Sequence, residues 1–270
     1  MVSGHGDMNY ALRVFDRIYK PGAFMWNTMI RGFGKTHQPD KAVDLYKRIH
    51  SDVAADTFTF SFLLKIIGGL EESVTLGKQL HCTILKLGLQ THHTYVRNSL
   101  MHMYGMVKDI EITHHLFEEI PNADLVAWNS IIDCHVHCQN YKQALHLFHR
   151  MLQSGVQSDD ATLKVTLSAC GVIGALDFGR RIHSSLVQQH TKLGESTSVS
   201  NSIIDMYAKC GVVEEAYHVF SSMKGKNVIS WNVMIIGLAT HGNGEEALAL
   251  FANMLKQNVE RPNDVTFLGC

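Results

Sequence analysis

The sequence is poor in proline, in net charge and in long apolar runs, and each shortage narrows the class of protein. Only four prolines occur in 270 residues, so helices meet few obligatory breaks. No run of about eighteen uncharged apolar residues exists, which excludes a membrane-spanning helix. Apolar residues nevertheless make up 46% of the chain, too many for a disordered protein.

Cysteine is also sparse, and no targeting leader is visible. The six cysteines stand mostly alone within apolar stretches, so they predict buried, reduced thiols of an intracellular protein: Cys82, Cys134, Cys138, Cys170, Cys210 and Cys270. The residues after Met1 form no Arg-rich, acid-poor amphipathic leader. We therefore expect no organelle address within this sequence.

The charge balance argues mildly against a nucleic-acid ligand. The formal net charge is −1, whereas phosphate binding draws much of its affinity from Lys and Arg. A local stripe of cations matters more than the sum, however. The composition thus leaves RNA binding open.

Motifs for catalysis and metal binding are missing. The sequence has no Gly-rich phosphate loop, no His-Glu-x-x-His and no nucleophile elbow, so we expect no enzyme activity and no cofactor. The segment Cys134-His-Val-His-Cys138 places two Cys at i, i+4, but its His would point away from that face. No second Cys or His pair stands at finger spacing. Buried thiols beside surface imidazoles are the preferred interpretation, and no metal site is expected.

What the sequence does contain is a long internal repeat. Three Trp-Asn pairs begin at Trp26, Trp128 and Trp231, separated by 102 and 103 residues. Two other patterns recur at the same step: Leu76-Gly-Lys-Gln-Leu-His81 as Phe178-Gly-Arg-Arg-Ile-His183, and Asn98-Ser-Leu-Met-His-Met-Tyr104 as Asn201-Ser-Ile-Ile-Asp-Met-Tyr207. Each long period divides into three units of the size of a helix–turn–helix repeat.

Apolar positions within each unit follow helical spacing, and prolines fall between the helices. We predict an all-α, right-handed superhelical solenoid of helix–turn–helix repeats, with full units at 23–56, 57–93, 94–124, 125–159, 160–196, 197–227 and 228–263. A partial unit occupies 1–22 and the start of another occupies 264–270. The chain stops inside an expected helix, as a fragment of a longer array would.

These patterns resemble the pentatricopeptide repeat (PPR) family. Val228–Ile235 and Glu245–Met254 look like its standard motif, Asn201–Gly211 like its short variant, and Leu76–Gly88 like its long variant. The alternation resembles the PLS subclass of land-plant organelle proteins. The tetratricopeptide repeat, a peptide-binding competitor of similar size, fits less well because its Trp-x2-Leu-Gly-x2-Tyr pattern is absent.

The resemblance implies RNA binding at about one base per standard or short motif, through the fifth and last residues of each. Carried over, the pairs are Asn27 with Asp56, Asn98 with Asp124, Asn129 with Asp159, Asn201 with Asn227, and Asn232 with Asn263. The first unit is one residue short near Asp52, so the assignment of Asp56 as its last residue depends on where that missing residue falls. In the family, Asn–Asp is associated with U and Asn–Asn with a pyrimidine, so the implied single-stranded RNA is near U-n-U-U-n-Y-Y.

The second residue of each motif resembles the family's wedge between bases. The candidates for base stacking are Phe24, Phe58, Tyr95, Val126 and Ile229, whereas Ala161 and Ser198 depart from the pattern. The long motifs offer Ser61 with His93 and Lys164 with Ser196, which match no reliable assignment. Aromatic stacking contributes about 1–3 kcal/mol per base, so the three aromatic residues are the strongest candidates.

Two alternatives stay open. The recurrent Asn residues could simply be N-caps, since polar residues near a helix start often cap it. The recurrent Trp residues are expected in the core.

The implied function is RNA recognition in a mitochondrion or chloroplast, serving editing or other transcript processing, with RNA-editing proteins as further partners and no membrane. A helical scaffold for protein partners is the alternative.

Overall fold

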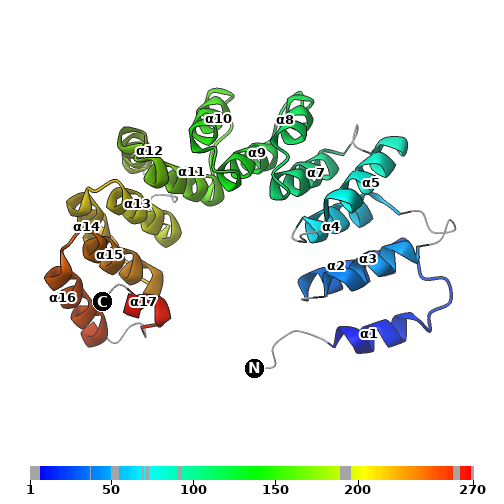
Figure 1. Ribbon diagram of the computed structural model, residues 1–270, viewed down its shortest axis with the longest axis horizontal. Coiled ribbons are helices and arrows are strands. Elements are labelled where there is room, and N and C mark those ends of the chain that lie inside the picture. Colours follow the sequence, from blue (N-terminus) through cyan, green and yellow to red (C-terminus); the bar gives the residue numbers. More distant parts are fainter. Residues whose placement is uncertain are drawn as a thin grey trace. The chain divides into compact units, whose positions relative to one another are not determined.

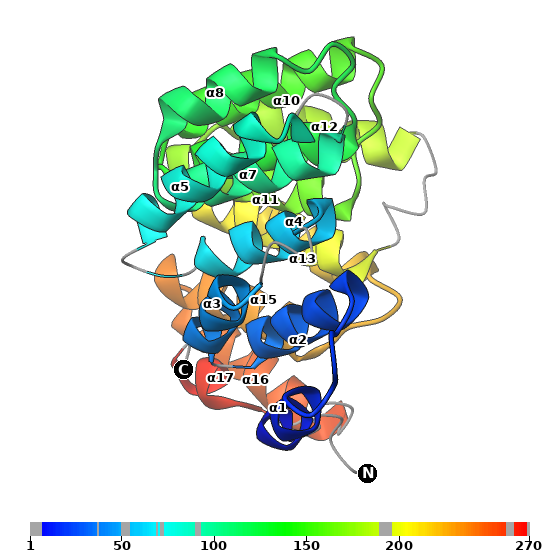
Figure 2. The same cartoon turned by 90° about the vertical axis from the view of Figure 1, so that its right-hand side faces the viewer.

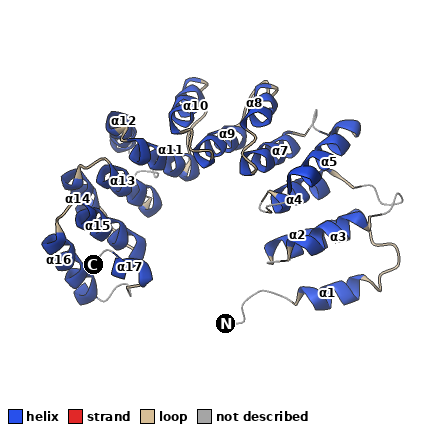
Figure 3. Cartoon of the chain, in the orientation of Figure 1, coloured by secondary structure: helices blue, strands red, loops and turns tan. Residues whose placement is uncertain are grey.

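The computed structural model describes residues 7–36, 38–49, 55–68, 70, 73–89, 93–188, 196–257 and 262–268. Every regular element among them is helical and none is a strand (Figure 3). No helix of the described residues is long and apolar enough to cross a membrane. The helices are α1 (Met8–Phe15), α2 (Ala23–Lys35), α3 (Pro39–Lys47), α4 (Thr57–Ile67), α5 (Ser73–Lys86), α7 (Thr94–Met106), α8 (Ile110–Glu118), α9 (Leu125–His137), α10 (Tyr141–Gln153), α11 (Asp160–Ile173), α12 (Leu176–Gln188), α13 (Thr197–Lys209), α14 (Val213–Ser222), α15 (Val228–Thr240), α16 (Gly244–Gln257) and α17 (Asp264–Leu268).

The helices form two compact parts, Met1–Cys138 and Gln139–Cys270. In the first part, α2, α4, α7 and α9 pack one against the next, and α3, α5 and α8 each lie against the helix before them (Figure 1). In the second part, α11, α13, α15 and α17 pack in the same way, and α12, α14 and α16 each cover their preceding helix. The perpendicular view again shows α3 alongside α2 (Figure 2). We call these two series of first helices the row helices.

The row helices start at the first residues of the predicted units, and the bounds of the units themselves stay predictions. Their first residues are Ala23, Thr57, Thr94, Leu125, Asp160, Thr197, Val228 and Asp264. The all-α fold of paired helices is as predicted. The assignment of standard, long and short classes stays a prediction.

The recurrent Trp residues lie in the core, as expected. Trp26, Trp128 and Trp231 are buried on their row helices. Each indole meets the edge of a Phe ring from the preceding helix, with centroids 4.7–5.0 Å apart: Phe15, Phe117 and Phe220 respectively. Edge-to-face aromatic pairs of this kind stabilise by about 0.5–1.5 kcal/mol beyond their area.

A His–Tyr hydrogen bond explains two of the other recurrent patterns. His81 on α5 places Nδ1 2.9 Å from the hydroxyl of Tyr104 on α7. His183 on α12 lies 3.0 Å from Tyr207 on α13 in the same way. Burial raises the pKa of Tyr104 to about 12, so its hydroxyl is protonated at neutral pH. The repeated His and Tyr therefore link a covering helix to the next row helix.

The structure corrects two expectations about the polar and sulfur-containing residues. His135 is buried rather than at the surface, because it packs against α8 with its Nε2 2.7 Å from Nε2 of His114. Cys82 is exposed, whereas Cys134 and Cys170 are buried as predicted. Burial raises the pKa of the Cys134 thiol to about 12, which leaves it protonated and unreactive.

Candidate nucleic-acid interface

The predicted last-position residues are helix caps. The side-chain oxygen of each accepts a backbone N–H in the first turn of the next row helix. The oxygen–nitrogen distances are 2.9 Å for Asp56, 2.9 Å for Asp124, 2.8 Å for Asp159, 3.0 Å for Asn227 and 3.2 Å for Asn263. This contact satisfies an otherwise open donor of the helix. In these five units the last residue thus fixes where the next row helix starts.

The fifth-position Asn residues are not caps, so the N-cap alternative is wrong for them. Each is the fifth residue of its own row helix, one turn beyond the cap. Four are buried, with only 4–7% of their surface exposed: Asn27, Asn98, Asn201 and Asn232. Asn129 is half-buried. Buried amides at this depth need a specific reason, because an unsatisfied polar group is costly.

Hydrogen bonds join the two residues of the following predicted pairs. Nδ2 of Asn27 donates to Asp56 over 2.9 Å, which brings together the pair that the short first unit had left in question. Nδ2 of Asn232 donates to Asn263 over 2.9 Å, and Nδ2 of Asn201 donates to Asn227 over a longer 3.3 Å.

The pair of Asn98 and Asp124 differs from these. Asn98 makes no described hydrogen bond to Asp124, and its Oδ1 is buried without a partner in the described part of the chain. Asn129 belongs to the first compact part and Asp159 to the second.

Asp56 is held as a carboxylate. Partial burial acts to raise the pKa of Asp56, but hydrogen bonds from the Thr59 backbone and from the side chains of Asn27 and Thr59 outweigh it. The pKa of Asp56 is therefore below its usual value. A carboxylate only accepts hydrogen bonds, so the group of Asn27 that faces it must be Nδ2.

A threonine that sequence reasoning missed completes two of these clusters. Thr59 donates its hydroxyl to Oδ1 of Asn27 over 2.7 Å, and Thr266 does the same to Asn232 over 2.7 Å. Both are the third residue of their row helix and both are buried. A threonine, Thr162, also stands at the equivalent position. The recurrence of Thr in the sequence could therefore have identified this residue.

All five predicted stacking side chains are exposed. Each lies three residues before a fifth position on the same row helix and so shares its face: Phe24, Phe58, Tyr95, Val126 and Ile229. Phe24 is 83% exposed. The rings of Phe58 and Tyr95 stack on each other, with centroids 5.6 Å apart and planes 25° apart, and the Tyr95 hydroxyl bonds to Thr57. These apolar groups point outward although burial would stabilise the chain.

The long-unit positions show no comparable pairing among the described residues. The Ser61 hydroxyl is buried and has no partner among the residues that the structure describes, His93 included. Ser196 donates to Asp160 over 2.6 Å, not to Lys164. They lack the amide–cap arrangement of the other units.

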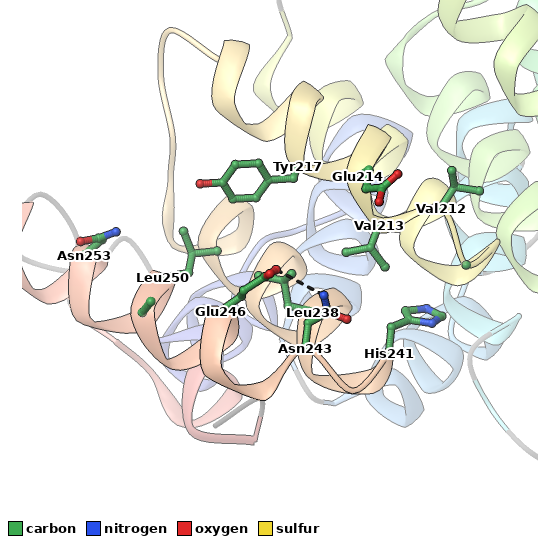
Figure 4. Close-up of a pocket in the computed structure, with 12 residues that line it drawn as sticks. Val212, Val213, Glu214, Tyr217, Leu238, His241, Asn243, Glu246, Leu250 and Asn253 are labelled. Atoms are coloured by element: carbon green, nitrogen blue, oxygen red, sulfur yellow. Dashed lines mark hydrogen bonds between the residues drawn. The ribbon is translucent and has the colours of Figure 1, made fainter.

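A groove of about 790 Å³ lies elsewhere, between α14, α15 and α16 (Figure 4). Tyr217 and Leu250 supply apolar lining, and Glu214 and Glu246 supply carboxylates. Asn243 donates to Glu246 over 3.3 Å. The carboxylates disfavour a phosphate backbone, and none of the predicted base-reading residues lines this groove.

The described residues contain no group of three or more His, Cys, Asp or Glu side chains arranged to hold a metal. Cys134 and Cys138 are therefore not joined by further ligands in the described part of the chain. The polar chemistry of the row helices is that of amides, carboxylates and hydroxyls.

Comparison with known proteins gives the family. The PPR repeat family is matched by residues 123–171 and 226–268, and the PPR repeat by residues 24–52 and 198–228. A chloroplastic/mitochondrial pentatricopeptide repeat-containing protein of Arabidopsis thaliana is 40% identical over 276 residues, covering 99% of this chain and 42% of that protein. Another from the same plant is 38% identical over 265 residues, covering 97% and 44%. The chain belongs to the PPR family and spans less than half the length of these relatives.

Solved structures agree on the fold. The crystal structure of the maize pentatricopeptide repeat protein PPR10 matches with a TM-score of 0.68 at 18% identity, over 96% of this chain and 38% of that one. PPR10 in complex with an 18-nt psaJ RNA element matches with a TM-score of 0.59 over 98% of this chain and 38% of that one. The likeness confirms the predicted class of helical-repeat fold.

Proposed function

We propose that this chain binds single-stranded RNA along its row helices, with about one base for each standard or short unit. The observation that carries the proposal is the recurrent buried Asn amide, bonded to the cap of the next helix and flanked by an exposed apolar side chain. An amide offers a donor and an acceptor to the edge of a base, and the exposed side chain offers a stacking surface. The likeness to PPR10, which has been crystallised with RNA, supports the same use.

Local charge supports this ligand despite the net charge of −1. The charged residues of α2, α4 and α7 are Arg31, Lys35, Lys65 and Arg97, without any carboxylate. Arg31 follows Asn27 by four residues and Lys65 follows Ser61 by four, which places each cation on the same helix face as a fifth position. A phosphate backbone passing these helices would meet a basic stripe.

The proposed target is near U-n-U-U-n-Y-Y, read from the 5′ end by units in chain order. The pairs assigned in the sequence supply U or a pyrimidine at five positions. At the second nucleotide, the stacked rings of Phe58 and Tyr95 leave no room for a base between them unless they separate. That contact supports an unread base there.

We further propose that the complete protein acts on transcripts in a chloroplast or mitochondrion, in RNA editing or another processing step with protein partners. The support is the naming of relatives as chloroplastic/mitochondrial or mitochondrial. The alternative, a protein-binding scaffold, would use the groove between α14 and α16 instead.

The experiment that tests the proposal compares wild type with Asn27→Thr. Selection from a randomised single-stranded RNA pool is expected to enrich the pyrimidine pattern for wild type. In the variant, preference at the first nucleotide should move from U toward G, as the family resemblance implies. The other positions serve as internal controls because their Asn residues are unchanged.

Circular dichroism melting accompanies the selection. Asn27 is not a cap, so the variant should retain the fold and bind its best RNA with similar affinity. No enrichment by wild type, or an unchanged base ranking at every nucleotide for Asn27→Thr, contradicts base reading. Binding to a protein partner with indifference to RNA would favour the scaffold.

A further inference from the structure

Each of two Asn amides in standard units is locked from both sides. Asn27 donates Nδ2 to the Asp56 carboxylate and accepts the Thr59 hydroxyl at Oδ1. The Thr59 hydroxyl also lies 2.9 Å from Asp56, so its single proton alternates between the two oxygens, with the shorter contact to Asn27. With a carboxylate on one side and a hydroxyl donor on the other, the amide cannot rotate by 180° without losing both bonds.

Asn232 repeats the arrangement without a carboxylate. Oδ1 of Asn263 is committed to the backbone N–H of Thr266 over 3.2 Å, so Asn232 must present Nδ2 to it. The Thr266 hydroxyl lies 2.7 Å from Oδ1 of Asn232 and 3.1 Å from Asn263, again favouring donation to the Asn amide. The same lock therefore occurs in both compact parts of the chain.

The short units lack this two-sided hydrogen bonding of the Asn amide. The residue equivalent to Thr59 is Ala127 after Asn98 and Ser230 after Asn201. Ala127 has no hydroxyl, and the Ser230 hydroxyl bonds to Asn227 over 3.0 Å instead. Oδ1 of both Asn98 and Asn201 is buried without a partner in the described part of the chain. The Asn201 amide is thus held only by its Nδ2 bond to Asn227, and the Asn98 amide is held by neither bond among the described residues.

We propose that Thr59 and Thr266 are positioning residues that set the sharpness of pyrimidine discrimination, an inference that rests on the proposed RNA binding. Uracil presents N3–H as a donor, whereas cytosine presents N3 as an acceptor. An amide fixed in one orientation suits one of them, and an amide free to turn suits both. The locked units therefore distinguish U from C more sharply than the short units do.

The test measures Kd for RNAs that carry U or C at the first or the third nucleotide. Wild type is expected to show a U/C ratio of about tenfold at the first nucleotide, equivalent to one mispaired hydrogen bond of about 1.4 kcal/mol, and a smaller ratio at the third. Thr59→Val keeps the branched shape but removes the hydroxyl, leaving only the bond from Asn27 to Asp56, so the first ratio should fall toward that at the third nucleotide. Thr59→Ser restores the donor and should restore the ratio.

Ala127→Thr is the reciprocal variant and remains informative if Thr59→Val does not fold. It should raise the ratio at the third nucleotide toward tenfold while leaving the first unchanged. If Thr59→Val weakens U and C RNAs equally, or Ala127→Thr leaves the third ratio at its wild-type value, the lock plays no part in selection. If wild type shows no base preference at any position, the proposed function itself fails.

Discussion

At the scale of single residues, capping and the proposed base recognition are carried by the same side chains. Asp56 accepts the backbone N–H of Thr59 to start α4 and also holds Asn27. Replacing Asp56 would therefore cost the cap, about 1 kcal/mol, together with any effect on RNA. A substitution of Asn27 would affect recognition without removing a cap, because Asn27 lies within its helix. Mutations at fifth positions are accordingly the cleaner probe of recognition.

His135 makes a single-residue prediction about pH. Burial, and then the neighbouring His114, lower the pKa of His135 to about 4, whereas an unfolded His titrates near ~6.5. The unfolded chain thus takes up this proton first as pH falls. The contribution of His135 to stability is complete above about pH 6.5 and is lost progressively toward pH 4.

We expect the melting temperature of wild type to fall over that window and His135→Gln to show a flatter profile. Thermal melts between pH 4.5 and 7.5 measure it. His146→Gln, at an exposed position on α10, is the matched control and should keep the wild-type slope. Parallel profiles for wild type and His135→Gln would contradict the assignment.

At the scale of helices, one covering helix is bound to the next row helix by the same hydrogen bond in each part. His183 and Tyr207 join α12 to α13 over 3.0 Å. The sequence could reveal that His and Tyr recur, since both repeat at the spacing of the long internal repeat. It could not reveal that they meet, because they lie on different helices about two dozen residues apart.

Tyr207→Phe should lower the free energy of unfolding by about 0.5–1.5 kcal/mol, the worth of one hydrogen bond, because only the hydroxyl is removed. Tyr217→Phe is the matched control, since Tyr217 is exposed on α14. Urea unfolding followed by circular dichroism gives both values. Equal effects from the two substitutions would mean that the His183 contact is not stabilising.

The helical fold was predictable from sequence for a physical reason, and the site only in part. Apolar spacing of 3.6 residues and a repeat of fixed length follow directly from how hairpins stack, and both are visible in one sequence. The paired residues Asn27 and Asp56 could be named from resemblance. The orientation of the Asn27 amide and the donation by Thr59 depend on three-dimensional contacts that no spacing encodes.

At the scale of the whole molecule, a net charge of −1 must be reconciled with a polyanionic ligand. The first compact part resolves this locally, because α2 and α4 carry Arg31, Lys35 and Lys65 on row helices without carboxylates. Binding that neutralises phosphates releases counterions, so log Kd should depend linearly on log salt. The prediction therefore concerns the slope, which reports the number of phosphate contacts.

Arg31→Glu and Lys65→Glu should each reduce the magnitude of that slope by about 0.7, the value for one contact to a single strand. Lys78→Glu is the control, because it makes the same change in net charge on the covering helix α5. Fluorescence anisotropy with the best selected RNA, at salt from about 50 to 200 mM, measures all four proteins. If a basic stripe on the row helices holds the RNA, the slope becomes smaller for Arg31→Glu and Lys65→Glu. The slope for Lys78→Glu then stays near that of wild type. Equal changes in all three variants would mean that RNA responds only to the total charge, and the row helices would lose their assigned role in holding the backbone.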